Sequence, residues 1–549
     1  MNAGKLFFLL IAVFTMGLFG CQRKMEVPTG VTGNVIIRET PLFIEKENQG
    51  IISVGLEIAD SVLLPELTNI RLVFGKEGKP KMIEGMVLNI EEKGKAVSGD
   101  TIRLEFLAPF TGEGNSIELG CDLPLNPGDY DLSLDISLKE NVNLEESFSL
   151  AEVQLIFGQK YLLALPQTEK FRFRPALVLR AAGQDNCDTY RIPGLITTAK
   201  GTLISVYDNR YNNSKDLQED IDVGMSRSTD GGQTWEPMKV IMDMGEWGGR
   251  PQRLNGIGDP SVLYDHTTHT IWVAAMWMSG GSPDDMNWWV SSPGMAPEET
   301  GQFILVKSTD DGLSWSGPIN ITQQIKDPEW QLLFAGPGRG ITLEDGTLVF
   351  PGQFKEDIGV QALDGGQYTS HSTIVFSKDN GQTWQIGTGA KPNTTEAQVV
   401  QLPDGSLMLN MRDDKNKFEK ERNNGRAVSI TNDFGKTWIT HPSSNSALPE
   451  PNCMASLIAH NMKVENEMKQ VLFFSNPDSK EQRINMTIKA SLDGGNTWPE
   501  SKQILLNEAY GNGYSCMTMV DDRTIGIVYE GVKELYFQKI PVKELCQDN

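Results

Sequence analysis

Histidine is scarce in this sequence: only five occur among 549 residues, and the HExxH and CxxC spacings are both missing. A metal site built from histidine or cysteine needs several such side chains at short, regular intervals. The sequence therefore predicts neither a bound metal ion nor another cofactor.

Positive charge is also in short supply. The chain has 49 Lys and Arg residues against 72 Asp and Glu residues, which gives a formal net charge of -23. This balance argues against nucleic acid as a partner, because phosphates need a broad basic face. Any anionic ligand must instead be attracted by a local cluster of positive side chains.

Long apolar runs are confined to the N-terminus. Residues 6–19 form such a run after Lys5, but it is too short for a comfortable membrane span. Residues 1–21 end in Leu-Phe-Gly-Cys, which resembles a bacterial lipoprotein signal with Cys21 as the acylated first residue. A plain secretory signal, with Cys21 nearby by chance, is the alternative. We expect an exported protein that is lipid-anchored to the bacterial outer membrane, facing the periplasm or the cell surface.

The remaining cysteines are few and scattered. An odd number in an exported chain leaves at least one free thiol, and no disulfide framework is implied. They are Cys121, Cys187, Cys453, Cys516 and Cys546.

The length favours two domains. In residues 22–170, apolar and polar side chains alternate with the period of two that is typical of strands with one buried face. The clearest run has its apolar positions at Tyr130, Leu132, Leu134, Ile136 and Leu138. This pattern predicts an N-terminal β-sandwich, for which both glycan binding and buttressing of the next domain remain open.

Residues 171–549 carry an internal repeat of the form Ser/Thr-x-Asp-x-Gly-x-Thr/Ser-Trp. Its five copies lie at residues 228–235, 308–315, 377–384, 431–438 and 491–498. In each copy the Asp can accept bonds from amides of its own turn, Gly supplies positive φ, and Trp can fill the space between units. A second repeat, Gly-Thr/Ser-Leu, opens apolar strands at residues 201, 346 and 405.

This spacing indicates a repeat architecture. About 365 residues, at ~60 per four-stranded unit, fit a six-bladed β-propeller. The alternative of five surface hairpins on a sandwich explains neither the spacing nor the tryptophans. We therefore expect an all-β protein in which a sandwich precedes a propeller.

The repeat resembles the Asp box of bacterial sialidases, and the sequence Tyr190-Arg191-Ile192-Pro193 resembles their Arg-Ile-Pro motif. The likeness extends over the C-terminal two-thirds of the chain, and the sandwich is similar to a domain that precedes sialidase propellers in related gut bacteria. The resemblance implies an exo-α-sialidase that acts with retention on sialylated glycoproteins, glycolipids or oligosaccharides. Asp boxes also occur in propellers that are not enzymes, so the activity depends on individual residues.

Three arginines match the family's arginine triad: Arg191, Arg412 and Arg483. The resemblance implies that they hold the carboxylate on the anomeric carbon of sialic acid. A planar guanidinium suits this task because it stays charged and binds carboxylate through two donors.

Asp216 matches the family's acid/base residue, which would protonate the leaving oxygen and later activate water. A solvated acidic loop is the alternative, because Glu219, Asp220 and Asp222 follow closely. Arg210 and Asp259 match positions that contact the sugar's hydroxyl and N-acetyl side. Asp259 could equally be a turn former before a proline.

Tyr514 matches the nucleophile, and Glu396 matches its partner. A neutral phenol is not repelled by the substrate's carboxylate, and a nearby glutamate can take its proton. The tyrosine nucleophile is a known property of the family and is taken from the resemblance. The alternative for Tyr514 is a core tyrosine, with Tyr510 as the neighbour most easily mistaken for it.

Three further questions stay open at this stage. The tryptophans of residues 272–289 are either pocket wall or blade core. Two alternative functions remain. A binding protein without turnover would need only the arginines, and an enzyme that transfers sialic acid to another hydroxyl would differ from a hydrolase in the shape of its acceptor site. We expect a monomer, and the sequence does not indicate a linkage preference.

Overall fold

The computed structural model describes residues 25–76, 80–93, 102–107, 115–167, 171–277 and 280–546. The proposed signal at residues 1–21, including Cys21, lies outside these ranges. Strands dominate, so the predicted all-β class is confirmed. The α-helices of the described part are single turns: α1 (Asn287–Val290), α2 (Thr322–Ile325) and α3 (Lys543–Cys546). No helix among the described residues is long and apolar enough to cross a membrane.

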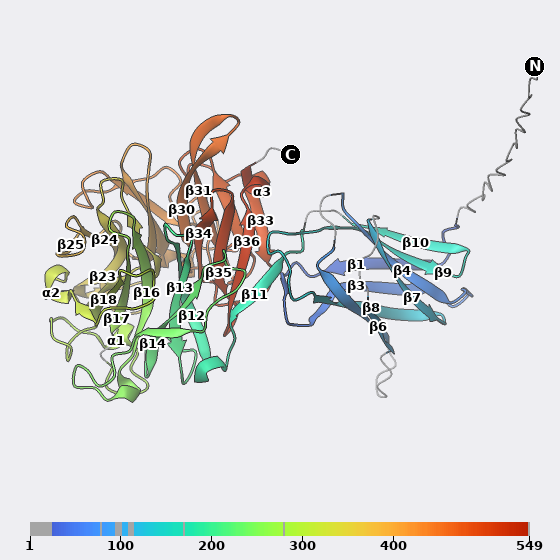
Figure 1. The fold of residues 1–549 in the computed structure, drawn as a ribbon, viewed down its shortest axis with the longest axis horizontal. Coiled ribbons are helices and arrows are strands. Elements are labelled where there is room, and N and C mark those ends of the chain that lie inside the picture. The colour runs from blue at the N-terminus through green and yellow to red at the C-terminus, as the bar shows by residue number, and fades with distance from the viewer. Residues whose placement is uncertain are drawn as a thin grey trace, which may run out of the picture.

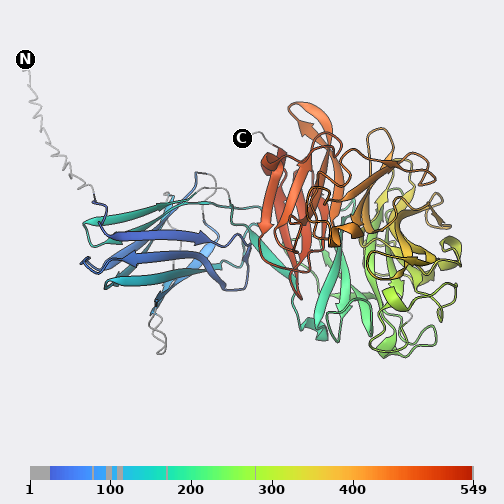
Figure 2. The ribbon, with the colours of Figure 1, turned by 180° about the vertical axis from the view of Figure 1, so that it is seen from behind.

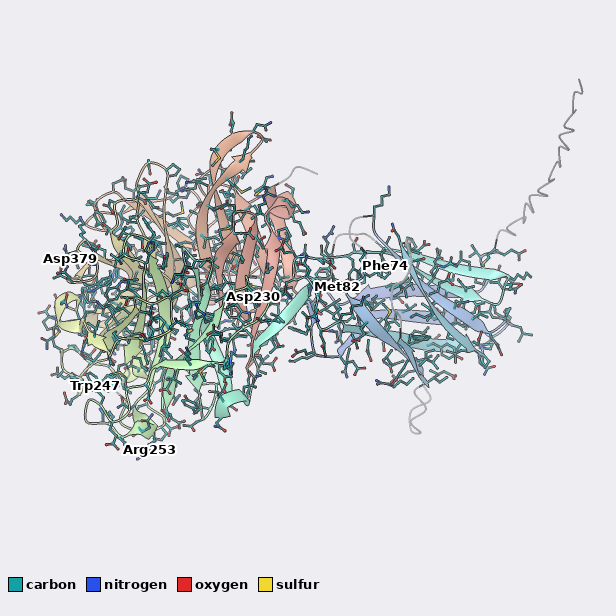
Figure 3. The ribbon with its side chains drawn as sticks, in the orientation of Figure 1. Phe74, Met82, Asp230, Trp247, Arg253 and Asp379 are labelled. Atoms are coloured by element: carbon teal, nitrogen blue, oxygen red, sulfur yellow. The ribbon has the colours of Figure 1, made fainter. Side chains whose placement is uncertain are left out.

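The N-terminal part contains two antiparallel sheets that share one hydrophobic core (Figure 1). The first has the order β1 (Val31–Ile37), β3 (Asn48–Ile58), β8 (Gly128–Leu138), β5 (Ile83–Glu92) and β6 (Ile102–Leu107). The second has the order β10 (Tyr161–Pro166), β9 (Leu150–Phe157), β4 (Leu67–Phe74) and β7 (Ser116–Leu123). Phe74 and Met82 mark this sandwich in Figure 3.

Strand β8 shows the alternation expected from the sequence, with one exception. Its apolar side chains from Tyr130 to Leu138 are buried, but Asp135, expected to face outward, is buried as well. Its carboxylate accepts bonds from the amide of Gly50 at 2.7 Å and from Nδ2 of Asn89 at 2.9 Å. These partners offset the cost of removing the carboxylate from water.

The C-terminal part contains six further sheets. The first and second contain β12 (Thr189–Thr197), β13 (Leu203–Arg210), β14 (Ile221–Ser228) and β15 (Lys239–Met242), and β16 (Ile257–Asp265), β17 (Thr270–Trp277), β18 (Gln302–Ser308), β19 (Ile319–Asn320) and β21 (Gly338–Arg339), respectively. The third contains β20 (Leu332–Ala335), β22 (Ile341–Thr342), β23 (Leu348–Gln361), β24 (Gln367–Ser377) and β25 (Gln385–Ile386). The fourth contains β26 (Thr394–Gln401), β27 (Leu407–Asp413), β28 (Ala427–Thr431) and β29 (Ile439–Thr440).

The last two sheets complete a ring. The fifth contains β30 (Ser456–Val464), β31 (Glu467–Pro477), β32 (Met486–Ser491) and β33 (Gln503–Asn507), and the sixth contains β34 (Ser515–Asp521), β35 (Thr524–Glu530), β36 (Leu535–Pro541) and β11 (Pro175–Arg180). Inner strands contact each other in the cyclic order β12, β16, β23, β26, β30, β34, and β34 returns to β12. This closed order is that of a β-propeller, seen from two sides in Figures 1 and 2.

The ring is closed by a strand from before the first propeller sheet. β11 pairs antiparallel with β36, so the sixth sheet joins segments from both ends of the propeller. β2 (Leu42–Phe43), which lies inside the predicted N-terminal domain, pairs in parallel with β11. A piece of the sandwich region therefore extends a propeller sheet.

The Asp boxes form the expected turns. In the first box, the amide of Thr234 donates to Oδ1 of Asp230 at 3.0 Å, and Oγ1 of Thr234 donates to Oδ2 at 2.6 Å. Gly232 has a φ of 85°, and Trp235 packs edge-on against Phe537 of the sixth sheet. The same Asp bonds recur in all five boxes. Figure 3 labels Asp230 on the side of the sandwich and Asp379 at the far side of the propeller.

Candidate active site

Backbone irregularities in the inner strands display several predicted site residues. The pairing register shifts between Arg191 and Gly194 in β12, between Gly258 and Ser261 in β16, and between Thr394 and Ala397 in β26. Such bulges redirect side chains and are common beside active sites. Arg191, Asp259 and Glu396 lie at these three positions.

Arg191 is held by a glutamate that was not predicted. Its Nε donates to Oε1 of Glu530, at the end of β35, over 3.1 Å. The same carboxylate accepts the amides of Ile192 at 2.8 Å and of Tyr514 at 2.9 Å. Ile192 has a φ of 59°, which is unfavourable for a β-branched residue. The buried Glu530 thus fixes a strained strand, an arginine and the tyrosine together.

The other two arginines meet at Asn452. Nη2 of Arg412 donates to Oδ1 of Asn452 at 3.1 Å, and Nη2 of Arg483 donates to its main-chain oxygen at 3.4 Å. Arg412 comes from β27, whereas Arg483 comes from the loop between β31 and β32. Nη1 of Arg483 also donates to the main-chain oxygen of Asn512 at 2.7 Å. Asn452 links the two cations without neutralising either.

Tyr514 and Glu396 form a direct pair. The phenol of Tyr514 donates to Oε1 of Glu396, and Nη1 of Arg412 donates to Oε2 of the same carboxylate at 2.6 Å. Nη1 of Arg412 also lies 3.2 Å from the phenol oxygen. The guanidinium carbons of Arg191 and Arg483 lie 5.2 and 5.7 Å from the centroid of the tyrosine ring. The three arginines therefore surround Tyr514.

The electrostatic setting of Tyr514 explains why it needs a base. Burial raises the pKa of its phenol well above the usual value, and the charge of Glu396 raises that pKa further. Arg412 and Arg483 act in the opposite direction. A phenol with a raised pKa becomes nucleophilic only if its proton is removed as it attacks, and Glu396 is placed to accept that proton.

Asp216 lies on the loop between β13 and β14, with two arginines as partners. Its Oδ1 is 2.7 Å from Nη1 of Arg191 and 2.7 Å from Nη1 of Arg210. Burial alone would raise the pKa of Asp216, but these two cations outweigh it and hold the pKa below its ordinary value. Its side chain is 56% exposed, so it is open to a ligand.

Arg210 is fully buried and holds the Asp216 loop in place by hydrogen bonds. Its Nη1 donates to the main-chain oxygens of Ser214 at 3.0 Å and Lys215 at 2.9 Å. Its Nε and Nη2 donate to Oδ2 of Asp208 at 3.1 and 2.8 Å. The resemblance implied sugar contact for Arg210, but in this structure its donors serve Asp208 and the loop.

Asp259 is a half-buried carboxyl with a left-handed backbone, φ 54°. Its amide donates to Oδ1 of Asp208 at 2.9 Å. Burial, followed by the charges of Asp208 and Asp216, raises the pKa of Asp259 well above its ordinary value. The raised pKa favours the neutral acid, which can donate a hydrogen bond to a sugar oxygen.

All eight predicted site residues thus belong to one connected group. Sequence reasoning missed Glu530, Asn452 and Asp208. Glu530 and Asp208 lie at or near the ends of apolar strands, which is a weak signal for a site, and Asn452 has no distinguishing pattern around it. They contribute by holding other site residues.

Tyr510 does not belong to this group. It is 59% exposed and lines a cavity of about 440 Å³ beside the sixth sheet, together with Phe43 of β2, Val532 and Tyr536. The structure therefore separates the two neighbouring tyrosines, and only Tyr514 faces the arginines.

The tryptophans of residues 272–289 divide between the propeller core and more exposed positions. Trp272 and Trp277 are buried in the propeller core. Trp288 is half-buried, and Nζ of the buried Lys355 lies over its ring, 3.5 Å from the ring centroid. Burial lowers the pKa of Lys355 to about 6. Trp289 is 47% exposed.

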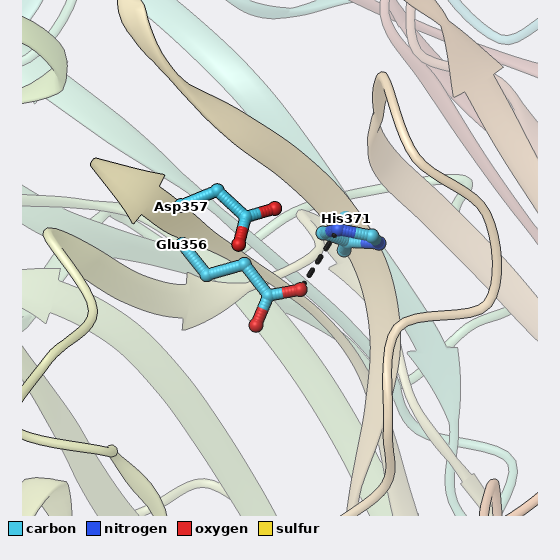
Figure 4. Close-up of side chains that lie close together, drawn as sticks. All are labelled: Glu356, Asp357 and His371. Carbon is cyan, nitrogen blue, oxygen red and sulfur yellow. Dashed lines mark ion pairs between the residues drawn. The ribbon is translucent and has the colours of Figure 1, made fainter. Parts of the chain in front are cut away.

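One group of three possible metal ligands occurs in the described part of the chain: Glu356, Asp357 and His371 (Figure 4). Nε2 of His371 lies 3.0 Å from Oε1 of Glu356. Nδ1 of His371 is buried without a partner, whereas a metal-bound imidazole normally donates its other N–H to an acceptor. These three residues lie on β23 and β24, outside the connected group of site residues, and the contact between His371 and Glu356 fits a hydrogen bond better than a metal centre.

The sequence is similar to those of known proteins. The family described as BNR repeat-like domain matches residues 201–529. A sialidase of Bacteroides fragilis (strain YCH46) is 43% identical over 537 residues, which cover 93% of this chain and 95% of the relative. The sialidase of Micromonospora viridifaciens is 30% identical over 358 residues, covering 64% of this chain and 51% of its own.

A solved structure extends the likeness to both parts of the molecule. Hadza microbial sialidase Hz136 has a TM-score of 0.79 and 38% identity, covering 93% of this chain and 100% of its own. The propeller, its Asp boxes and these identities together show that this chain belongs to the sialidases, a family of glycoside hydrolases.

Proposed function

We propose that the protein is an exo-α-sialidase that removes terminal sialic acid from glycoconjugates with retention, through a tyrosyl-enzyme intermediate. The observation that carries this proposal is the hydrogen-bonded pair of Tyr514 and Glu396 inside a ring of three arginines. Binding a sugar carboxylate needs only the arginines. The phenol–carboxylate pair adds a nucleophile with its base, which a binding protein does not require.

Substrate binding follows from charge. Arg191 and Arg412 pair with carboxylates of the site, whereas Arg483 donates to main-chain oxygens and keeps its positive charge for a ligand. Their planar donors match the carboxylate on the anomeric carbon. On binding, this carboxylate competes with Asp216 for Arg191, which frees the aspartate for the leaving group. Asp259 would donate a hydrogen bond to an oxygen of the sugar.

In the first step, the phenol oxygen of Tyr514 attacks the anomeric carbon while its proton passes to Glu396. The glycosidic bond breaks, and the leaving oxygen takes a proton from Asp216. For this role Asp216 must be protonated in the complex. Loss of its contact with Arg191 and the arrival of a second carboxylate both raise its pKa relative to the free protein.

In the second step, Asp216 removes a proton from water, whose oxygen attacks the anomeric carbon. The bond between that carbon and the tyrosine oxygen breaks, and Glu396 returns the proton to the phenol. Two displacements at one carbon restore the original configuration, so the product is released as the α-anomer.

The experiment is to incubate the purified protein with a fluorogenic aryl α-sialoside and follow the released sugar by NMR. We expect sialic acid whose first-formed anomer is α. Release of the β-anomer first would contradict the tyrosyl intermediate. Release of no sugar would contradict the proposed activity and favour a binding protein. Transfer to an added alcohol in preference to water would favour transglycosylation.

We also propose that the enzyme is exported, anchored through Cys21 to the outer membrane and monomeric. The support for the anchor is the sequence at residues 18–21, which resembles a lipoprotein signal. Sialylated glycans outside the cytoplasm would then be its substrates.

A further inference from the structure

The residue after the proposed acid/base has an unusual backbone. Leu217 has a φ of 39°, in the left-handed region that a branched L side chain rarely occupies. Its side chain is nevertheless buried, with 5% exposed. A strained residue persists only when its surroundings hold it, and such residues cluster at functional sites.

The side chain of Leu217 fills a small apolar pocket between three propeller sheets. Its buried neighbours in this pocket are Ile221 of β14, Met276 of β17, and Leu332 and Phe334 of β20. Trp288 covers the pocket from α1. Leu217 is thus the one buried apolar side chain that the loop of residues 211–220 contributes to this cluster.

A glycine makes room for this insertion. A Cβ atom built on Gly258 would lie 2.7 Å from Cδ2 of Leu217, which is too close for van der Waals contact. Gly258 directly precedes Asp259, another site residue. The space taken by Leu217 therefore exists because the inner strand β16 has no side chain at this position.

Main-chain bonds hold the loop on both sides of Asp216. Before it, the guanidinium of Arg210 donates to the main-chain oxygens of Ser214 and Lys215. After it, the amide of Asn287 in α1 donates to the main-chain oxygen of Leu217 at 3.3 Å. Asp216 lies between these attachments, and its half-exposed side chain is the part that is free to change partner.

We propose that Leu217 is a positioning residue for Asp216: its buried side chain anchors the loop so that the carboxyl can leave Arg191 yet stay beside the leaving oxygen. This inference rests on the proposed function of Asp216. Leu217 itself touches no substrate. Removal of the anchor lets the carboxyl drift, which weakens proton transfer more than it weakens binding or attack by Tyr514.

The test compares two sialosides that differ in how much they need an acid. An alkyl sialoside has a poor leaving group and requires protonation, whereas a 4-nitrophenyl sialoside does not. Leu217→Ala should lower kcat/KM, which reports only the steps up to cleavage of the glycosidic bond, at least about tenfold more on the alkyl sialoside than on the nitrophenyl sialoside. Leu217→Asn should do the same, because asparagine tolerates the left-handed backbone but cannot fill an apolar pocket.

Two controls separate anchoring from general damage. Leu217→Met fills the pocket with a similar volume and should keep both rates within about threefold of the wild type. Leu343→Ala removes an equally buried leucine from a different core cluster and should change both rates equally. Equal losses on the two sialosides in both Leu217→Ala and Leu217→Asn, or no loss in either, would overturn the inference. An inactive wild-type protein would instead contradict the proposed function.

Discussion

Oδ1 of Asp216 lies 2.7 Å from Nη1 of Arg191, the arginine that the family resemblance assigns to the substrate's carboxylate. A carboxylate of the protein therefore occupies a place that a substrate carboxylate needs. Since one guanidinium nitrogen cannot serve both fully, the proposed mechanism predicts that binding of sialic acid and release of Asp216 are coupled. In that mechanism, release from Arg191 raises the pKa of Asp216, so that the carboxyl can carry a proton.

Asp216→Asn should impair natural sialosides selectively. An aglycone that departs as a stable anion needs little protonation, so we expect a loss of about a hundredfold or more on alkyl sialosides and a much smaller loss on nitrophenyl sialosides. Both steps should be timed, because Asp216 also serves as the base in the second step. Equal losses on both substrates would mean that Asp216 has only a structural or binding role.

Tyr514→Phe should remove turnover and keep binding. The change keeps the ring volume and removes one hydroxyl, so the folding cost is about 1 kcal/mol at most. Calorimetry should show that affinity for sialic acid persists, because the three arginines remain. The hydrolysis rate should fall more than about a hundredfold, since the covalent partner is lost.

The partner of the tyrosine provides the control for this experiment. Glu396→Gln should give a similar loss, and the double variant should be little worse than either single one, as expected for residues that act as a unit. Near-normal turnover in Tyr514→Phe would show that the nucleophile lies elsewhere.

Glu530→Ala should destabilise the protein and weaken sialic acid binding together. It leaves Arg191 and the amides of Ile192 and Tyr514 without their shared acceptor. Breaking such a buried pair costs about 3–5 kcal/mol, measurable by denaturant unfolding. As a control, Glu236→Ala removes a partly exposed ion pair with Arg227 and should cost less than about 1 kcal/mol. Similar small effects in both variants would contradict the role of Glu530.

The Asp boxes predict a specific loss of stability in acid. Hydrogen bonds within each turn, from a Ser or Thr side chain and amide, lower the pKa of Asp310 and of Asp379 from 3.8 to about 2. A carboxyl with a lowered pKa in the folded state stabilises the fold above its unfolded pKa. That contribution is lost as the pH falls from about 4 to about 2.

The free energy of unfolding should therefore decrease over this range, and Asp310→Asn should make the decrease shallower. The measurement is a series of denaturant titrations between pH 5 and pH 2 under identical salt (about 0.1 M). The same slope in Asp310→Asn and the wild type would show that the box aspartates do not contribute.

Cys21→Ser should release the protein from membranes without changing catalysis. An acyl anchor supplies membrane affinity independently of the fold, and Cys21 lies far in sequence from every site residue. In a detergent phase separation, the Cys21→Ser protein should move from the detergent phase to the aqueous phase. As a control, Cys121→Ser, a change at a half-buried cysteine, should partition like the wild type. Unchanged partitioning of Cys21→Ser would refute the anchor.

The sequence alone determined those features that depend on neighbours along the chain. Each Asp box is made by bonds between a residue and one four positions later, so Asp230 and Thr234 specify their turn wherever it lies. Alternation in β8 fixed which face is buried, and five spaced tryptophans indicated a ring of repeats. The arginines, Asp216, Glu396 and Tyr514 were found only because their local motifs match a known family.

The tertiary structure decided every relationship that joins distant parts of the chain. Closure of the propeller brings Glu530 to Arg191, 339 positions earlier, and no local pattern marks such a pair. It also draws Leu217 into a pocket built by three sheets, and pairing within the sandwich places Asp135 beside the donors of Gly50 and Asn89. These contacts depend on where ring closure and bulges place each backbone, because the energies of charge pairing and packing act over a few ångströms in space and not along the sequence.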